Sequence, residues 1–332
     1  MKILAYSVRP YETDAIKNWS ELHGVQVDVF DGELTAENAK HAEGYDGVSV
    51  QQVADIKDEA IYTTLKGFGI NQISSRTAGV DMFDLDIATK NGIKVTNVPR
   101  YSPNAIAEFS ITLGLMLLRQ VPKALNKATI ERDFRWHPGI IGREVRSLTV
   151  GVVGTGFIGF TAAQLWKGFG AKVIAYDMYP KTGVEDVLTY CDTPADLFKQ
   201  ADIVTLHLPL TAESKHIVNA ESLKLMKKDA ILINTGRGGL VDTEALIAAL
   251  ENGEIAAAGL DVLDDEMAYM NKIVDEDVIA KAHLSKLEKM ENVISTYHLA
   301  FFTTTAVGNM VEISFDNIRN EILGEGVVNY CN

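Results

Sequence analysis

Three residues of this sequence, Arg237, Glu266 and His298, are of types that together could hold a carboxylate and transfer a proton. Each follows an apolar run typical of a buried strand, in "ILINTGRGGLVD", "GLDVLDDE" and "STYHLAFFT". A guanidinium binds a carboxylate through two hydrogen bonds, an imidazole can protonate a carbonyl oxygen, and a neighbouring carboxylate stabilises the imidazolium. Each residue also has a structural alternative: a surface cation, one of several acids, or a core histidine.

A glycine pattern, Gly154-Thr-Gly156-Phe-Ile-Gly159, follows the apolar strand expected at residues 149–153 and opens a helical stretch. Gly154 would allow a tight turn, Gly156 would let the backbone approach a pyrophosphate, and Gly159 would let helix and strand pack closely. Unpaired N–H groups at the start of a helix also favour phosphate. The alternative is an ordinary glycine-rich turn, but the surrounding strand and helix favour a dinucleotide site.

The next expected strand, residues 172–176, is followed by Asp177. A carboxylate at this point can accept hydrogen bonds from the adenosine ribose and would repel a 2′-phosphate. This predicts NAD rather than NADP, although Lys181 lies close in sequence and would soften the repulsion. Hydride transfer with NAD needs an acid/base and an anchor for the substrate. At the later strand ends, the histidine and the glutamate would form the acid/base pair, and the arginine would anchor the substrate carboxylate.

These residues require elements that bring strand ends together. Short β-branched runs alternate with helical patterns, which is typical of parallel sheets in α/β domains. In the first hundred residues we expect strands at 3–8, 25–30, 47–50, 70–75 and 94–97, with helices such as 13–22 and 58–66 between them. From residue 147 a second series is expected, with strands at 149–153, 172–176, 203–208, 231–235, 257–262 and 293–296.

The expected fold is α/β, with two doubly wound parallel-sheet domains and a cleft between them: a Rossmann domain for NAD and a flavodoxin-like substrate domain. The Rossmann domain spans residues 101–299, and its first helix follows Ser102 and Pro103, a favourable helix start. The substrate domain is discontinuous, residues 1–100 and 300–332, because the apolar face of the last helix is expected to pack back on it. Two chain crossings would then form a hinge.

The composition excludes several classes of partner. The net charge of −14 over 332 residues disfavours nucleic acid and anionic membranes. Cys191 and Cys331 belong to no Cys-x-x-Cys or Cys/His cluster, so neither a metal site nor a disulfide framework is expected. The longest apolar stretch, residues 111–118, is too short to span a membrane, and the N-terminus does not resemble a signal peptide. We expect a cytoplasmic protein.

Six segments in a fixed order carry a resemblance to a known family: "RTAGVD" at 76–81, "NVPRYSPNAIAE" at 97–108, "VGVVGTGFIG" at 150–159, "FGAKVIAYD" at 169–177, "INTGRGGLVDTEAL" at 233–246 and "HLAFFTTTAV" at 298–307. With them, essentially the whole chain resembles the NAD-dependent D-2-hydroxyacid dehydrogenases, and most closely the D-lactate and D-2-hydroxyisocaproate dehydrogenases.

The resemblance implies that Arg237, Glu266 and His298 are catalytic and that the first domain closes over the substrate. It implies substrate contacts from Tyr101, from the N–H groups of Ala78 and Gly79, and from Val50 and Phe301. It implies cofactor contacts from Gly154, Thr155, Gly156, Phe157, Ile158, Gly159, Asp177, His207, Pro209, Thr235, Gly236 and Asp261, with the His207 and His216 imidazoles structural. A homodimer interface is expected on the helix after Ser102 and the segment that follows it.

The sequence departs from the family pattern at four places. Tyr297 precedes the histidine where proline is common, Gly236 replaces alanine, and "RTAGVDMFDLD" replaces an Asn-Val-Gly type of loop. Val50 stands where lactate-preferring relatives carry an aromatic residue, which would leave room for a larger substrate, whereas Phe301 resembles those relatives.

The hypothesis is NADH-dependent, reversible reduction of pyruvate to D-lactate. One alternative is a broader D-2-hydroxyacid dehydrogenase that prefers 2-oxoisocaproate, phenylpyruvate or 2-oxoglutarate. A second alternative, from another class, is an NAD-sensing interaction module, because related folds serve as transcriptional corepressors. The intact catalytic trio and the lack of appended basic or disordered segments disfavour it.

Overall fold

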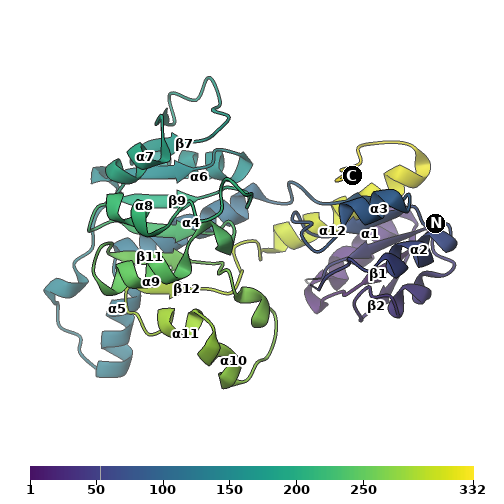
Figure 1. Ribbon diagram of the computed structural model, residues 1–332, viewed down its shortest axis with the longest axis horizontal. Coiled ribbons are helices and arrows are strands. Elements are labelled where there is room, and N and C mark those ends of the chain that lie inside the picture. Colours follow the sequence, from purple (N-terminus) through teal and green to yellow (C-terminus); the bar gives the residue numbers. More distant parts are fainter. Residues whose placement is uncertain (53) are drawn as a thin grey trace. The chain divides into compact units, whose positions relative to one another are not determined.

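The computed structural model describes residues 1–52 and 54–332, which form two compact units (Figure 1). The first unit comprises Met1–Ser102 and Phe302–Asn332, and the second comprises Pro103–Phe301. The domain limits expected from the sequence lie within a few residues of these limits.

The first unit is built on a five-stranded parallel sheet of order β2-β1-β3-β4-β5. Its strands are β1 (Lys2–Tyr6), β2 (Gln26–Phe30), β3 (Gly47–Val50), β4 (Gln72–Ser75) and β5 (Lys94–Thr96). Its main helices are α1 (Thr13–His23), α2 (Glu59–Gly67), α3 (Leu85–Lys90) and α12 (Thr304–Leu323). All pairs are parallel, so the carboxyl ends of the strands share one edge.

Alternation along β1 explains how the helices cover the two faces of this sheet. Ile3 and Ala5 pack in one cluster with apolar residues of α1 and α12. Leu4 and Tyr6 point to the opposite face and pack with residues of α2. The final helix therefore belongs to the first unit, as its apolar face indicates, and Trp19 Nε1 of α1 donates a hydrogen bond of 2.9 Å to Asp316 in it.

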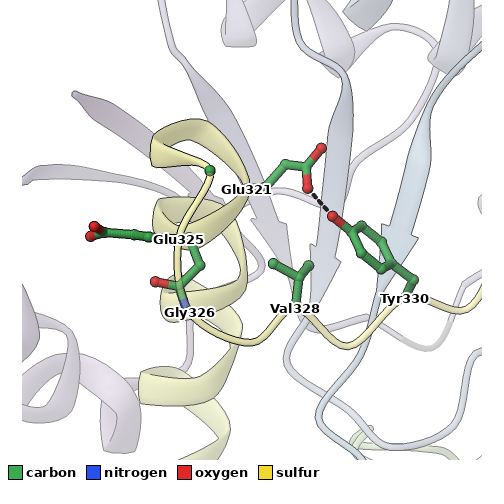
Figure 2. Close-up of a pocket in the computed structure, with 7 residues that line it drawn as sticks. Glu321, Glu325, Gly326, Val328 and Tyr330 are labelled. Atoms are coloured by element: carbon green, nitrogen blue, oxygen red, sulfur yellow. Dashed lines mark hydrogen bonds between the residues drawn. The ribbon is translucent and has the colours of Figure 1, made fainter.

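The chain after α12 returns to the edge of the sheet. A left-handed Gly324, with φ of +66°, ends the helix, and Tyr330 then forms an antiparallel bridge with Thr96, the last residue of β5. Figure 2 shows the Tyr330 hydroxyl hydrogen-bonded to Glu321 of α12. Sequence periodicity does not predict this pairing, because the tail is too short to show a pattern of its own.

The second unit contains a seven-stranded parallel sheet of order β12-β11-β10-β9-β6-β7-β8. Its strands are β6 (Thr149–Val153), β7 (Lys172–Tyr176), β8 (Thr189–Tyr190), β9 (Ile203–Leu206), β10 (Ile231–Asn234), β11 (Ala257–Leu260) and β12 (Val293–Ser295). Its helices are α4 (Pro103–Leu118), α5 (Val121–Asn126), α6 (Phe157–Gly168), α7 (Pro194–Gln200), α8 (Ala220–Leu225), α9 (Thr243–Glu251), α10 (Glu276–Lys281) and α11 (Leu284–Leu287).

Two apolar layers cover the sheet of the second unit. Leu113 and Leu117 of α4 pack with Trp166 of α6 on one face, and α7, α8 and α9 cover the other. Gly114 makes the first layer possible, because a Cβ there would lie 2.9 Å from both Trp166 and Ile233. Within the described residues no single helix could cross a membrane by length and composition; α4 and the segment Val121–Glu131 pass that test only together, with a 58° bend.

Candidate active site

The functional side chains of the second unit follow strands that all run in one direction. The loops after β6, β7, β9, β10, β11 and β12 therefore leave the same edge of the sheet. The chain reverses its strand order between β6 and β9, and an α/β sheet binds its ligands in the crevice at such a point. The predicted arginine, glutamate and histidine all follow strands on one side of this point.

His298 and Glu266 form a hydrogen-bonded pair. Nδ1 of His298 lies 2.9 Å from Oε1 of Glu266, and the two side chains are 30% and 13% exposed. The second carboxylate oxygen, Oε2, accepts the N–H of Leu263 at 3.0 Å. Because Nδ1 faces the carboxylate, Nε2 is the ring atom left for a substrate.

Asp261 holds the turn on which His298 lies. Its carboxylate accepts hydrogen bonds from the Thr296 hydroxyl at 2.5 Å, the Leu299 N–H at 2.8 Å and the Ala300 N–H at 2.9 Å. Its carbonyl accepts the N–H of His298 at 2.8 Å. His298 has a φ of +64°, a conformation that costs free energy for a residue with a Cβ. Asp261 thus stabilises a strained turn, and its contact with the cofactor stays a prediction.

The Arg237 loop packs against the loop that carries Glu266. Asn234 fixes this loop, because its side chain donates to the Arg237 carbonyl at 2.9 Å and accepts the Gly236 N–H at 3.0 Å. A Cβ on Gly238 would lie 2.1 Å from the carbonyl carbon of Leu263. Any side chain at position 238 would therefore clash, and only glycine allows the Arg237 loop to lie this close to the Glu266 loop. The half-buried Arg237 guanidinium also donates to the Gly236 carbonyl, at 2.9 Å.

The glycine loop after β6 has the features of a phosphate site. Gly154 has a φ of +90°, and a Cβ on Gly159 would lie 1.9 Å from the Gly154 carbonyl oxygen. A Cβ on Gly156 would meet nothing within 4 Å, so open space lies beside the backbone there. Gly156 is the N-cap of α6 and provides no side-chain cap, and the first turn of a helix favours an anion.

Asp177 is bound to this loop. One carboxylate oxygen accepts the N–H of Thr155 at 2.6 Å and its hydroxyl at 3.0 Å, and the other accepts the Tyr179 N–H at 2.8 Å. A carboxylate offers about four lone pairs, so acceptor capacity remains for a ribose hydroxyl. The Lys181 ammonium lies over the rings of Phe157 and Phe160, at 5.4 and 5.0 Å from their centroids.

Two further polar groups lie at this edge. The ring of His207 approaches the Thr205 hydroxyl at 2.9 Å through Nε2, and burial lowers the pKa of the imidazole to about 4. This histidine is neutral at pH 7, which agrees with a structural ring. The buried Thr235 hydroxyl oxygen has no hydrogen-bond partner in the described part of the chain. The sequence predicted both residues beside the cofactor, and the roles stay predictions.

The predicted carboxylate loop lies in the first unit, after β4. The N–H groups of Ala78 and Gly79 have no hydrogen-bond partner among the described residues, as an anion-binding backbone requires. Val50, the predicted specificity residue, is 0% exposed and packs in the core with residues of α2. The Tyr101 carbonyl accepts a hydrogen bond of 2.6 Å from the Asn309 side chain.

Phe301 lies beside the histidine in the second unit, with ring centroids 6.2 Å apart and the rings edge to face. The predicted residues of this unit follow strands that end at one edge of its sheet, and among them His298 contacts Glu266 and Phe301. The supporting roles of Asp261, Asn234 and Gly238 were not predicted from the sequence. The close spacing of glycines in "NTGRGG" was the available signal for Gly238.

Comparison with known proteins shows the family to which the chain belongs. Residues 111–300 match the family described as D-isomer specific 2-hydroxyacid dehydrogenase, NAD binding domain. The chain is 50% identical over 318 residues to a D-2-hydroxyacid dehydrogenase (NAD(+)) of Clostridioides difficile, with 96% of each chain covered. The chain belongs to the D-2-hydroxyacid dehydrogenase family. It is therefore an NAD-dependent oxidoreductase.

Two other members of the family extend the comparison. A D-lactate dehydrogenase of Lactiplantibacillus plantarum is 42% identical over 323 residues, which cover 97% of this chain and 96% of that one. The NAD-complexed D-isomer specific 2-hydroxyacid dehydrogenase from Lactobacillus delbrueckii ssp. bulgaricus superposes with a TM-score of 0.91 at 38% identity, with both chains fully covered. The two parallel-sheet α/β domains predicted from the sequence are confirmed.

Proposed function

We propose that this dehydrogenase reduces pyruvate to D-lactate with NADH, reversibly. The observation that carries the proposal is the His298–Glu266 pair, 2.9 Å between Nδ1 and Oε1, at the sheet edge that also carries the glycine loop. A histidine whose Nδ1 is engaged by a carboxylate presents Nε2 as the acid/base atom.

The reaction needs one hydride and one proton. NADH, when bound, supplies the hydride to the carbonyl carbon. Protonated His298 donates its Nε2 proton to the carbonyl oxygen, while Glu266 stabilises the imidazolium through Nδ1–H. The product is the 2-hydroxyacid, and His298 recovers its proton from solvent before the next reduction. In the oxidation direction, neutral His298 accepts the hydroxyl proton.

The cofactor residues are those of the glycine loop and the strand ends beside it. The N–H groups at the start of α6 and the open space beside Gly156 support a pyrophosphate there. Asp177 would accept the ribose hydroxyls. Backbone and side-chain contacts from Thr155, Phe157, Ile158, His207, Pro209, Thr235, Gly236 and Asp261 complete this assignment.

As the resemblance to the family implies, Arg237 is assigned to the substrate carboxylate, and so are the N–H groups of Ala78 and Gly79. A guanidinium gives two parallel hydrogen bonds to a carboxylate, and free backbone N–H groups add more. Tyr101 is assigned a packing or hydrogen-bonding contact with the substrate.

Pyruvate is proposed as the preferred substrate because Phe301 lies against the His298 ring, where a bulky aromatic side chain limits the space for a large substituent. The small side chain of Val50, which is buried in the first unit, argues for a larger substituent, and its contact with the substrate stays a prediction. The alternative, a preference for 2-oxoisocaproate, phenylpyruvate or 2-oxoglutarate, is favoured by the broad name of the 50% identical relative. Values of kcat/KM for the four acids, measured side by side, decide between them.

The alternative of an NAD-sensing module predicts NADH binding without turnover of any 2-oxoacid, and the same assay tests it.

The proposal also includes a homodimer and a cytoplasmic location. The dimer is supported by a run of exposed apolar side chains after α4, with Trp136 98% exposed: Leu125, Ile130, Phe134, Trp136 and Ile141. Light scattering of wild-type protein and Trp136→Asp tests the dimer, and cell fractionation tests the location.

A further inference from the structure

Each N–H group assigned to the substrate carboxylate is one end of a peptide unit whose other end is anchored. The Ala78 N–H shares a peptide unit with the Thr77 carbonyl, which accepts the Val98 N–H at 2.9 Å. The Gly79 N–H shares one with the Ala78 carbonyl, which accepts the Asn97 side-chain amide, Nδ2, at 2.7 Å. In a trans peptide the C=O and N–H groups point in opposite directions, so a donor on the carbonyl fixes the direction of the N–H group.

Asn97 is itself held in place by the C-terminal part of the chain. Its N–H donates to the Asn329 carbonyl at 3.1 Å, and its carbonyl accepts Nδ2 of Asn317 at 2.9 Å. Asn317 is fully buried, and its Oδ1 accepts both the N–H and the side-chain amide of Asn329, each at 2.9 Å. The Asn97 main chain is thus bonded on both sides, which leaves its side chain directed at the Ala78 carbonyl.

We propose that Asn97 is a positioning residue for substrate recognition. Its amide fixes the Ala78–Gly79 peptide so that the Gly79 N–H faces the carboxylate of the 2-oxoacid, and it polarises that N–H group through the peptide. This inference rests on the proposed function. It concerns the binding of the carboxylate and not the transfer of hydride or proton.

The test compares Asn97→Ala and Asn97→Asp with wild type and with Asn91→Ala. Asn91 is a matched control because its side-chain amide also donates to a main-chain carbonyl, that of Ile87 at 2.9 Å, but it precedes β5 whereas Asn97 follows it. Asn97→Asp keeps the size of the side chain and replaces the donor by an acceptor. The quantities measured are KM for pyruvate, the inhibition constant of oxamate, kcat, the Kd of NADH and the melting temperature.

A carboxylate contact is made equally in the ground state and the transition state, so its loss raises KM and leaves kcat nearly unchanged. We expect KM and the oxamate constant to rise roughly three- to tenfold in Asn97→Ala, the equivalent of one hydrogen bond, and further in Asn97→Asp. NADH affinity should be unchanged in both, and Asn91→Ala should match wild type.

An unchanged KM in a folded Asn97 variant, or an equal rise in Asn91→Ala, would overturn the inference. A loss confined to kcat would also overturn it, because the residue would then act on the chemical step. Wild-type protein that binds NADH and turns over no 2-oxoacid would instead overturn the proposed function, and the inference with it. The wild-type sample alone reveals that outcome, so the two failures are distinguishable.

Discussion

Asp261 is hydrogen-bonded to His298 and to the turn that follows it. The Asp261 carbonyl accepts the His298 N–H at 2.8 Å, and the Asp261 carboxylate accepts the N–H groups of the next two residues, Leu299 and Ala300. The conformation of the proposed proton donor therefore depends on a buried carboxylate that directly follows the neighbouring strand, β11. If asparagine replaces Asp261, an NH2 group takes the place of one carboxylate oxygen. Each of the three hydrogen bonds to this carboxylate is then lost or weakened.

The first prediction concerns this carboxylate. In Asp261→Asn, one amide hydrogen must face a main-chain N–H or the Thr296 hydroxyl, so we expect the free energy of unfolding to fall by about 1–3 kcal/mol. The turn at His298 should shift, and kcat for pyruvate reduction should fall at least tenfold. Denaturant unfolding and steady-state kinetics measure the two effects. Asp242→Asn is the control, because Asp242 caps α9 through the Ala245 N–H and asparagine caps equally well; a kcat loss of equal size there would contradict the prediction.

The second prediction concerns pH. Reduction requires protonated His298, so the rate of pyruvate reduction should decline as pH rises, while the rate of lactate oxidation should increase. In Glu266→Gln the imidazolium loses a carboxylate 2.9 Å away. The decline in reduction should then begin at lower pH. Profiles of kcat/KM in both directions measure this shift, and identical profiles for wild type and variant would exclude Glu266 as the supporting group.

The third prediction separates two glycines of the same motif. A Cβ on Gly156 meets no atom within 4 Å, so Gly156→Ala should fold with nearly wild-type stability. Its methyl group would enter the space assigned to the pyrophosphate, and the Kd of NADH should rise at least tenfold. Gly159→Ala should behave in the opposite way, because its Cβ would lie 1.9 Å from the Gly154 carbonyl oxygen and would destabilise the fold itself. Calorimetry of binding and of unfolding distinguishes the two; full NADH affinity in Gly156→Ala would place the pyrophosphate elsewhere.

The fourth prediction follows from the buried ring of His207. Burial lowers its pKa from 6.5 to about 4, so between these pH values the unfolded chain binds a proton that the folded chain does not. The free energy of unfolding should therefore decrease as pH falls through this window, by on the order of 3 kcal/mol in total. Urea unfolding at pH 7 and pH 5 measures the effect. His207→Gln removes the titrating group, so the decrease should be smaller in that variant; an equal decrease would assign the effect to other groups.

The sequence predicted the parts of the site that depend on local patterns. The glycine motif, Asp177 and the three strand-end residues are recognisable because each follows an apolar run, and parallel strands bring their carboxyl ends to one edge. The strands themselves lie close to their expected positions, although β9, β10 and β11 end before the loop residues that the apolar pattern had included. Of those loop residues, Thr235, Asp261 and Val262 are buried, and Leu208 is half-buried.

The remaining parts depend on contacts that no local pattern records. The hydrogen bonds of Asp261 hold a turn in which His298 adopts a left-handed conformation. The cluster of Asn97, Asn317 and Asn329 joins segments distant in sequence. Strand alternation places Val50 in the core of the first unit, whereas the sequence placed it beside the substrate, and that contact stays a prediction. The two-residue strand β8 and the short helix α5 are too brief to produce a periodic signal.

The central claim is that His298 is the acid/base of a pyruvate reductase. The most direct test is NADH oxidation by purified protein with pyruvate, 2-oxoisocaproate and phenylpyruvate, for wild type and His298→Gln, with NADH affinity measured for both. The account predicts turnover by wild type with pyruvate as the best substrate, a loss of kcat of at least a hundredfold in the variant, and equal NADH affinity. A variant that reduces pyruvate at the wild-type rate would contradict it.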